Sequence, residues 1–479
     1  MQSDSRRYAT KIINKLNKNL VKQVNWKSRS LQFVLSFLIA LGLSYVIKEP
    51  SFTEGQTSVL FILIFAVGLW VTEAIPPFAV GILIIGALVF TMSNLESENV
   101  KQYVQTWSDS VIWLFLGGFF IAQAMQKTAL DQSLLKFIVP KLGEKSKYIL
   151  LGLMLITAFL SMLMSNTATT AMMIASITPI TLSLGKEAPL TKALLIGIPT
   201  AAAIGGMGTI IGSAPNAIAV GALDGIGIRI SFMEWMLIGI PVALILIFGF
   251  WYGLLKKYKI KRKSLDLSFL QKTKQNTDAN ITTSQVRVTV IIIVASLIFW
   301  LSSQWTGIPV AAVSGIPIVG LTMFGILDAD DMRKLPWDTL MLVAGGLALG
   351  IAVQQQGLTD YFISFINIKD FNFYLLAIIF ALISVVFSNI MSNTATTTIM
   401  IPLAISFAAL IPEQSPKIIP LIIALSASCA LLLPVSTPPN AIAYSTGKLD
   451  QKDFRFGGIF IGIIGPVLVS LWVILVEFI

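Results

Sequence analysis

Apolar segments long enough to cross a bilayer follow one another along almost the whole chain. A membrane-spanning helix needs about 17–25 apolar residues, because each helical residue rises only about 1.5 Å. Eleven segments meet this requirement, and they are residues 31–47, 57–75, 76–93, 110–126, 190–220, 232–255, 286–302, 308–326, 338–355, 418–445 and 456–478. The pattern therefore predicts an all-α polytopic membrane protein with eleven transmembrane helices.

Two further apolar stretches, residues 148–184 and 373–411, are each interrupted near the middle by a polar cluster. The arms of each stretch are too short to be separate spans, but they can form helices that reach the middle of the bilayer and return. Irregular backbone at that depth has to be satisfied by protein or water, and Ser, Asn and Thr can cap the helix that follows. We therefore expect two re-entrant hairpins with polar tips.

Lys and Arg are distributed unevenly between the segments that connect the spans. With a cytoplasmic N-terminus and two hairpins that return to their side of entry, 29 of the 34 Lys and Arg lie in cytoplasmic segments and 5 lie outside. Cytoplasmic loops carry such an excess in membrane proteins. We expect a multi-pass protein of the cell membrane with its C-terminus outside. Residues 1–30 form a basic cytoplasmic N-terminus, and residues 256–285 form a cytoplasmic linker.

The composition agrees with this class of protein and excludes several kinds of chemistry. Only 12% of the residues are charged, which is too few to cover a water-soluble surface. The chain has no histidine, which excludes Ser-His-Asp catalysis and His-ligated metals. Its one cysteine, Cys429, lies in an apolar run and is expected to be a small buried hydrophobe. No acid, base or nucleophile with a partner occurs in the spans, so we do not expect an enzyme.

The chain consists of two related halves, 31–255 and 286–479. Four landmarks recur in the same order at nearly one offset: Met164–Thr170 (MSNTATT) and Met391–Thr397, Pro215-Asn216 and Pro439-Asn440, Gly117-Gly118 and Gly345-Gly346, Ile75-Pro76 and Ile308-Pro309. Such a pattern indicates an internal duplication. The first hairpin is entered after four spans and the second after nine, so the two copies have opposite orientation. An inverted repeat makes a transporter the leading interpretation.

Two of the spans contain helix breakers as well. Gly205–Asn216 and Pro434–Asn440 combine glycine or proline with Ser, Thr and Asn inside otherwise apolar segments. Breaks of this kind free backbone carbonyls and direct the N-terminus of the next half-helix at the gap. With the two hairpin tips, four helix starts converge near the midplane and form a site for an anion without Lys or Arg. Carbonyl and hydroxyl oxygens there can also hold Na⁺, which favours symport of an anion with sodium.

Other roles are open for some of these residues. Small polar residues commonly mediate helix packing in membranes, although the duplication of a whole tip in opposite orientation favours a binding site. For the pairs Gly117-Gly118 and Gly345-Gly346 we keep the interpretation of close helix packing. Glu73 lies at a cytoplasmic span end, where a structural role is as good an interpretation as proton coupling.

These motifs, from about Trp70 to the last span, resemble the divalent anion:sodium symporter family, whose members carry dicarboxylates, citrate or sulfate. The resemblance implies a homodimer and an elevator mechanism, in which a mobile transport domain carries the site across the membrane past a scaffold domain. The scaffold is expected at about 31–126, 232–255 and 286–355. The transport domain is expected at about 148–220 and 373–479.

The resemblance also implies roles for individual residues. The implied substrate contacts are Asn166, Thr167, Asn393, Thr394, Thr437 and Pro438. The implied sodium ligands are Ser165 and Asn166 with Gly212 at one site, and Asn393 with Ser436 at the other. This chain has GSAPN at 212–216 where the family commonly has GTPPN, a change that loses a methyl group and a ring near the first sodium but keeps a hydroxyl.

Together these features favour sodium-coupled symport of C4-dicarboxylates such as succinate, malate or fumarate. The alternatives are sodium-independent dicarboxylate exchange and transport of citrate or sulfate. A sensor with a transporter-like core would need an added signalling domain. The expected partners are a small dicarboxylate, sodium ions and the lipid bilayer, with neither an organic cofactor nor nucleic acid.

Overall fold

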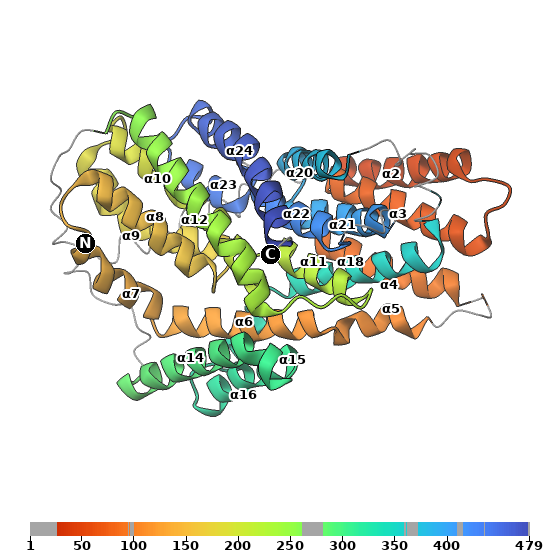
Figure 1. The fold of residues 1–479 in the computed structure, drawn as a ribbon, viewed down its shortest axis with the longest axis horizontal. Helices are drawn as coiled ribbons and strands as arrows, with labels where there is room; N and C mark the ends of the chain where they lie inside the picture. Colours follow the sequence, from red (N-terminus) through yellow and green to blue (C-terminus); the bar gives the residue numbers. More distant parts are fainter. Residues whose placement is uncertain are drawn as a thin grey trace.

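The fold is that of a computed structural model, which describes residues 26–93, 95, 100–260, 281–358, 361, 372–409, 415–434 and 436–477. This part of the chain is all-helical (Figure 1). Ten of its helices are long and apolar enough to cross a membrane, so the chain is a multi-pass membrane protein. Residues 1–25 of the predicted basic N-terminus and residues 261–280 of the predicted linker lie outside the described residues, and 26–30 form the start of the first described helix.

Every predicted span coincides with one helix or with two short ones. In the first half these are α2 (Trp26–Ile47), α3 (Glu54–Thr72), α4 (Pro77–Met92), α6 (Ser110–Lys127), α10 (Pro189–Gly205) with α11 (Ala214–Asp224), and α12 (Phe232–Lys257). In the second half they are α14 (Thr283–Thr306), α15 (Val310–Val313) with α16 (Gly315–Met323), α18 (Trp337–Gln355), α22 (Ile418–Ala427) with α23 (Pro438–Ser445), and α24 (Gln451–Glu477). The all-α polytopic fold class is confirmed.

Both interrupted stretches fold as helix, polar tip and helix. The first consists of α8 (Ser146–Ser161) and α9 (Asn166–Leu184), and the second of α20 (Phe373–Ile390) and α21 (Asn393–Ala409). The expectation that the arms are too short to span is wrong for α9 and α20, which are two of the ten described helices of membrane-crossing length. Short helices connect the spans, and they are α5 (Lys101–Gln105), η1 (Thr106–Ser108), α7 (Leu130–Ile138), η2 (Val139–Leu142) and α17 (Ala329–Arg333). Local sequence therefore located the tips correctly, because Ser and Asn are favoured as caps where a helix begins.

Equivalent helices of the two halves begin and end in the same way. Thr53 and Thr282 each form a capping box with the glutamine three residues later, at the starts of α3 and α14. Both helices end in a left-handed residue, Glu73 with φ 50° and Gly307 with φ 68°, which lie two residues and one residue before the repeated Ile-Pro pair. Glu73 thus has a structural position as a helix C-cap, which glycine occupies in the other half.

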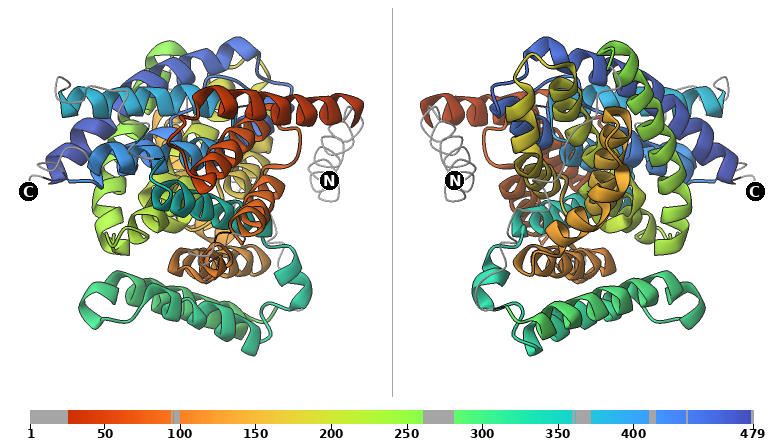
Figure 2. Two further views of the ribbon diagram at one scale, coloured as in Figure 1. Left: turned by 90° about the vertical axis from the view of Figure 1, so that its right-hand side faces the viewer. Right: turned by 90° about the vertical axis from the view of Figure 1, so that its left-hand side faces the viewer.

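The halves interlock rather than fold side by side. The helix α4 packs against α18, and α6 packs against α15 and α16, so each of these contacts joins the two repeats. Deeper in the molecule, α11 packs on the second hairpin through α21, and α23 packs on the first hairpin through α9. Figure 2 shows α14 and α16 as an outer layer beyond α6. The two repeats seen in the sequence therefore pack closely on each other, and each contributes helices to the surroundings of the other repeat's hairpin.

The repeated glycine pairs lie where helices of the two halves touch. A Cβ atom on Gly345 would overlap the backbone of Gly81 in α4. In the equivalent contact, a Cβ atom on Gly117 would lie 2.9 Å from the Cβ of Ser314, beside α15. The second glycine of each pair faces a different neighbour, Ile211 for Gly118 and Thr398 for Gly346. The interpretation of these pairs as close helix packing is confirmed.

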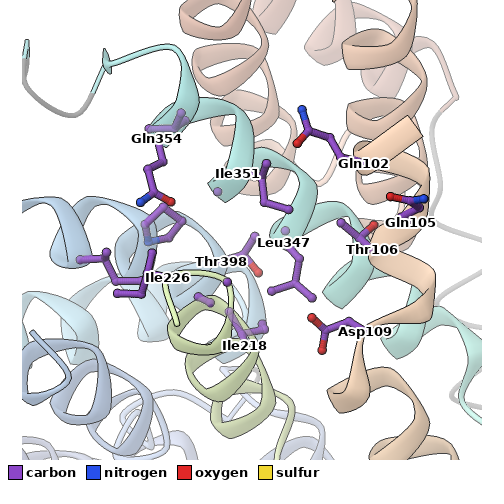
Figure 3. A pocket seen from close by; sticks show the side chains of 18 of the residues that line it. Gln102, Gln105, Thr106, Asp109, Ile218, Ile226, Leu347, Ile351, Gln354 and Thr398 are labelled. Atoms are coloured by element: carbon purple, nitrogen blue, oxygen red, sulfur yellow. The ribbon is translucent and has the colours of Figure 1, made fainter. Parts of the chain in front are cut away.

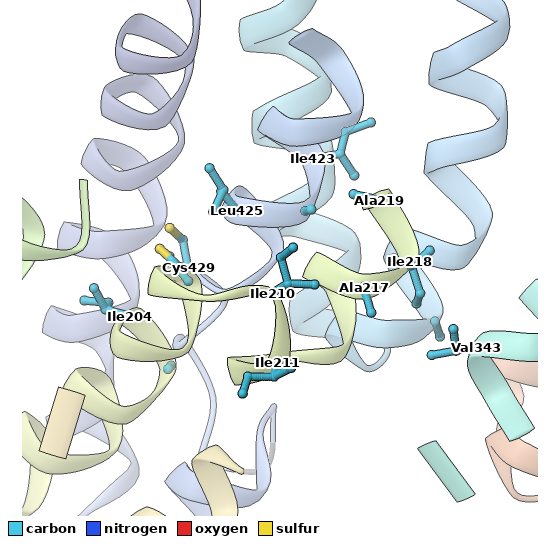
Figure 4. Packing of buried hydrophobic residues seen from close by; sticks show 14 of the residues in the cluster. Ile204, Ile210, Ile211, Ala217, Ile218, Ala219, Val343, Ile423, Leu425 and Cys429 are labelled. Carbon is cyan, nitrogen blue, oxygen red and sulfur yellow. The ribbon is translucent and has the colours of Figure 1, made fainter. Parts of the chain in front are cut away.

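The middle of the fold is an apolar layer around the first broken span. Ile210 and Ile211 of the break lie among residues of α11 and α22, with Ile204 and Leu425 close by (Figure 4). Cys429 is a free, fully buried thiol in the same layer, as expected for a small hydrophobe. This packing holds the break in place without any charged group.

We expect Gly345→Ala to destabilise the protein, because the added methyl group would push α18 away from α4. Overpacking of this kind costs about 1–3 kcal/mol. The matched control is Gly86→Ala in α4, where a Cβ atom meets nothing within 4 Å and replaces a poor helix former. Thermal unfolding of the detergent-solubilised protein should show a lower midpoint for the first variant alone. Equal midpoints would contradict the contact.

Candidate functional site

The first hairpin tip is a short irregular segment between α8 and α9. Ser165 is the N-cap of α9, and its side chain accepts a hydrogen bond of 3.2 Å from the backbone N–H of Ala168. Asn166 follows as the first helical residue, and its Oδ1 accepts a hydrogen bond of 2.6 Å from Ser161. The Ser161 hydroxyl also lies 2.8 Å from the carbonyl oxygen of Ala202 in α10. The tip is therefore tied to the broken span beside it.

The second tip repeats this backbone arrangement with different partners. Ser392 caps α21 by accepting a hydrogen bond of 3.1 Å from the N–H of Ala395. Asn393 occupies the place of Asn166, but its Oδ1 is buried with no hydrogen-bond partner among the described residues. The hydroxyl of Ser388, which stands where Ser161 stands in the first hairpin, is likewise buried without a partner. Two oxygens in this tip are thus left without a hydrogen bond.

The first broken span is held open by one asparagine. Asn216 is fully buried in α11, and its Nδ2 donates hydrogen bonds of 2.8 Å to the carbonyl oxygens of Gly206 and Thr209. The hydroxyl of Thr209 in turn donates to the carbonyl of Met162 in the first tip. These hydrogen bonds satisfy carbonyl groups that have lost their helical partners at the break. This need accounts for the asparagine of the Pro-Asn pair that follows each break.

The second break is satisfied in the same way. Asn440 donates from Nδ2 to the carbonyl oxygens of Leu431 and Leu433, at 3.4 and 3.1 Å. Thr437 is the N-cap of α23 and accepts a hydrogen bond of 3.4 Å from the N–H of Asn440. The N–H of Leu432 donates to Asn389 of the second hairpin, so this break too is joined to its tip.

One cavity of about 440 Å³, here named the tip cavity, brings both tips and both breaks together. All of the predicted substrate and sodium residues line it, namely Ser165, Asn166, Thr167, Gly212, Asn393, Thr394, Ser436, Thr437 and Pro438. They come from segments more than 200 residues apart in the sequence. The structure therefore places every candidate residue around a single space.

Sequence reasoning missed two groups of residues that line the tip cavity. One is a face of α6 that includes Phe115, Gly118 and Phe119, and the other is the start of α18 with Asp338 and Thr339. The lining contains neither Lys nor Arg, and Asp338 is its one charged side chain. The only signal for them was the repeated glycine pair, which marked α6 and α18 as related helices without indicating a cavity.

Oxygens suited to a sodium ion gather beside the first tip. Gly206 and Gly212 approach each other so closely that a Cβ atom on Gly206 would lie 2.6 Å from Asn166 Oδ1 and 3.0 Å from the carbonyl oxygen of Gly212. With Ser161 bonded to the same Oδ1, hydroxyl, amide and carbonyl oxygens lie within one small volume. The described residues hold no group of three or more His, Cys, Asp or Glu that could bind a metal. The neutral oxygen set fits a monovalent hard cation better than zinc.

The chain was compared with known proteins. Residues 25–477 match the family described as the sodium:sulfate symporter transmembrane region. The chain belongs to this family. The membership confirms the interpretation drawn from the paired SNT motifs, and these relatives are transporters rather than enzymes.

Individual relatives of this symporter span most of the chain. It is 30% identical to the sodium-dependent dicarboxylate transporter SdcS of Staphylococcus saprophyticus over 474 residues, which cover 92% of this chain and 88% of the relative. It is also 30% identical to SdcS of Staphylococcus aureus, covering 84% of this chain and 82% of that one.

Two solved structures share the fold of the symporter at low sequence identity. One is MtrF of Neisseria gonorrhoeae, with a TM-score of 0.56 at 12% identity over 85% of this chain and 96% of that chain. The other is the YdaH transporter of Alcanivorax borkumensis, with a TM-score of 0.54 at 10% identity over 84% and 98%. Both likenesses concern the fold alone.

We expect Asn216→Asp to destabilise the symporter, because aspartate has the same shape but cannot donate to the carbonyls of Gly206 and Thr209. Each buried carbonyl left unpaired costs about 1–3 kcal/mol. The control is Asn372→Asp at the start of α20, where the side chain only accepts hydrogen bonds and aspartate can replace it. Thermal unfolding without ligand is the measurement. Two equal midpoints would show that Asn216 does not brace the break.

Proposed function

We propose that the chain is a secondary transporter that carries C4-dicarboxylates such as succinate, malate or fumarate together with sodium ions. The observation that carries this proposal is the tip cavity, where two hairpin tips and two helix breaks meet without Lys or Arg. A dianion there has to be stabilised by neutral donors and by cations that bind with it. The sodium-dependent dicarboxylate transporters among the relatives support the same substrate class.

The dicarboxylate binds between the two tips. Four helices, α9, α11, α21 and α23, begin at the tip cavity, and each directs the positive end of its dipole toward it. Asn166 and Thr167 supply side-chain hydrogen bonds from one tip, and Asn393 and Thr394 supply them from the other. Thr437 and Pro438 close the site at the second break. A carboxylate at each end of the substrate suits two facing tips.

Sodium ions occupy the two junctions between a tip and a break. At the first junction, Ser165, Asn166 and the carbonyl of Gly212 are the ligands, with the Ser161 hydroxyl next to Asn166 Oδ1. At the second, Asn393 and Ser436 bind the ion, and the unpaired oxygens of Asn393 and Ser388 are the reason to place it there. Each ion neutralises part of the dianion's charge and orders a tip before the substrate closes the site.

Transport follows an elevator movement within a homodimer. The scaffold comprises residues 31–126 and 286–355, and the transport domain comprises 148–220 and 373–479. Residues 232–255 were expected in the scaffold, but α12 packs on α10 and α24, and Trp235 donates a hydrogen bond of 2.9 Å to the carbonyl of Met207 in the break. We therefore group α12 with the transport domain.

On α6 and α18, glycines lie at the contact with the transport domain. Gly118 of α6 meets Ile211, and a Cβ atom on Gly346 of α18 would lie 2.5 Å from Thr398 Cγ2. The glycines leave room for the side chains of Ile211 and Thr398, so α6 and α18 present no side chain of their own at these two points. The N-terminus lies in the cytoplasm and the C-terminus outside, as the distribution of Lys and Arg favours.

Uptake of labelled succinate into proteoliposomes tests the function. Symport predicts accumulation in empty vesicles that depends on an inward sodium gradient and stops when sodium is replaced by potassium. Accumulation that requires internal dicarboxylate and ignores sodium would establish exchange instead. Competition by unlabelled malate, fumarate, citrate and sulfate ranks the substrates, and preference for citrate or sulfate would reject the C4-dicarboxylate assignment.

We expect Asn166→Ala and Asn393→Ala each to lower sodium-driven uptake by at least 100-fold, because each variant lacks a side chain that contacts both the ion and the substrate. The loss of two charge-assisted interactions of about 1.5–3 kcal/mol each is enough for that factor. Asn372→Ala is the matched control, since this exposed amide lies outside the tip cavity. Folding is checked by size-exclusion chromatography. Normal transport by both tip variants would reject the site.

A further inference from the structure

A second cavity of about 470 Å³ lies between the start of α6 and the helices α11, α18 and α21 (Figure 3). Its polar wall comes from α5, η1 and the start of α6, with Gln102, Gln105 and Asp109. Facing residues from α11, α18 and α21 include Ile218, Leu347 and Thr398. None of the predicted site residues lines this second cavity, so the proposed transport site does not account for it.

The two cavities use the equivalent helices α6 and α18 in a reciprocal way. The tip cavity is bounded by the Gly118 face of α6 and by the start of α18. The second cavity is bounded by the Gly346 face of α18 and by the start of α6. Gly118 and Gly346 are equivalent members of the repeated glycine pairs. Each of the two helices therefore contributes its glycine face to one cavity and its first residues to the other.

Each cavity is lined by one carboxylate and by no Lys or Arg. In the tip cavity the carboxylate belongs to Asp338, in the first turn of α18. In the second cavity it belongs to Asp109, the N-cap of α6. A pocket meant only to attract a dianion has no use for a carboxylate, so a charge retained at the equivalent end of both cavities calls for a role toward cations.

Charged neighbours do not cancel these two carboxylates. At the end of α6, Lys127 is paired with Asp328 and Asp331. Close to Asp109 there is another acid, Asp224, which pairs with Arg229 at 3.5 Å. The nearby basic groups are thus matched by acids of their own.

We propose that Asp338 and Asp109 attract sodium ions to the two faces of the transporter, Asp338 in the tip cavity on the cytoplasmic side and Asp109 in the second cavity on the extracellular side. This inference rests on the proposed function and orientation. A negative charge at the wall of a cavity concentrates cations and repels a free dianion. Sodium gathered there offsets the repulsion, so the substrate enters a cavity that already holds its co-transported ion.

The experiment measures sodium dependence separately at each face. Uptake of labelled succinate into intact cells samples the extracellular entrance, and uptake into inverted membrane vesicles samples the cytoplasmic one. Asp109→Asn should raise the half-saturating sodium concentration in cells about fivefold and leave the vesicle value unchanged, and Asp338→Asn should do the reverse. That factor is expected for one unit charge several ångströms from the ion path, at a dielectric constant between those of protein and water.

A second readout distinguishes attraction of sodium by the two aspartates from a structural role of these residues. At saturating sodium, neither variant should raise the half-saturating succinate concentration, because removing the charge also removes the repulsion of the dianion. Asn keeps the helix cap at position 109, where the side chain accepts a hydrogen bond of 2.8 Å from the N–H of Val111. Asp109→Glu and Asp338→Glu should restore the sodium dependence of the original protein. Asp330→Asn is the control, because this exposed aspartate lines neither cavity.

The failures of the two proposals are distinguishable. If the unaltered protein shows no sodium-dependent dicarboxylate uptake at either face, the proposed function fails. The uptake can be present while an aspartate variant shifts the sodium dependence equally at both faces, at neither face, or only at the face opposite to the expected one. Any of these results rejects the proposed role of Asp109 and Asp338 toward sodium.

Discussion

The fold depends on satisfying backbone groups where helices stop inside a membrane. An unpaired carbonyl in hydrocarbon costs several kcal/mol, so a helix can break there only if other protein groups replace its hydrogen bonds. Asn216 and Asn440 do this at the two broken spans, and each bonds two carbonyls of the preceding segment. Thr209 and Asn389 then connect each break to a hairpin tip. The site exists because breaks and tips stabilise one another.

The two halves share this backbone plan but differ in their polar groups. Ser161 and Asn166 are bonded to each other in the first hairpin, whereas Ser388 Oγ and Asn393 Oδ1 in the second have no hydrogen-bond partner in the part of the chain that the structure describes. Two sodium sites built on this repeat are therefore related in position and unequal in chemistry.

Much of the fold followed from local features of the sequence. The lengths of apolar segments located the spans, and the polar residues inside 148–184 and 373–411 located both tips. The residues expected to bind substrate and sodium all line one cavity, because each occupied a helix break that the sequence marked. Asp338 and Phe119 could not be found in this way. They lie in or beside ordinary span sequence and acquire a role only through the packing of α6 and α18 around the tips.

The sequence by itself determined where helices begin and end, since hydrophobicity, capping residues and helix breakers act within a few residues of their position. It also determined that the halves repeat. Only the tertiary structure decided that the repeats exchange partners, with α11 against the second hairpin and α23 against the first. Contacts between segments more than 200 residues apart depend on complementary surfaces, such as the meeting of Gly81 and Gly345, and no local pattern encodes which surfaces fit together.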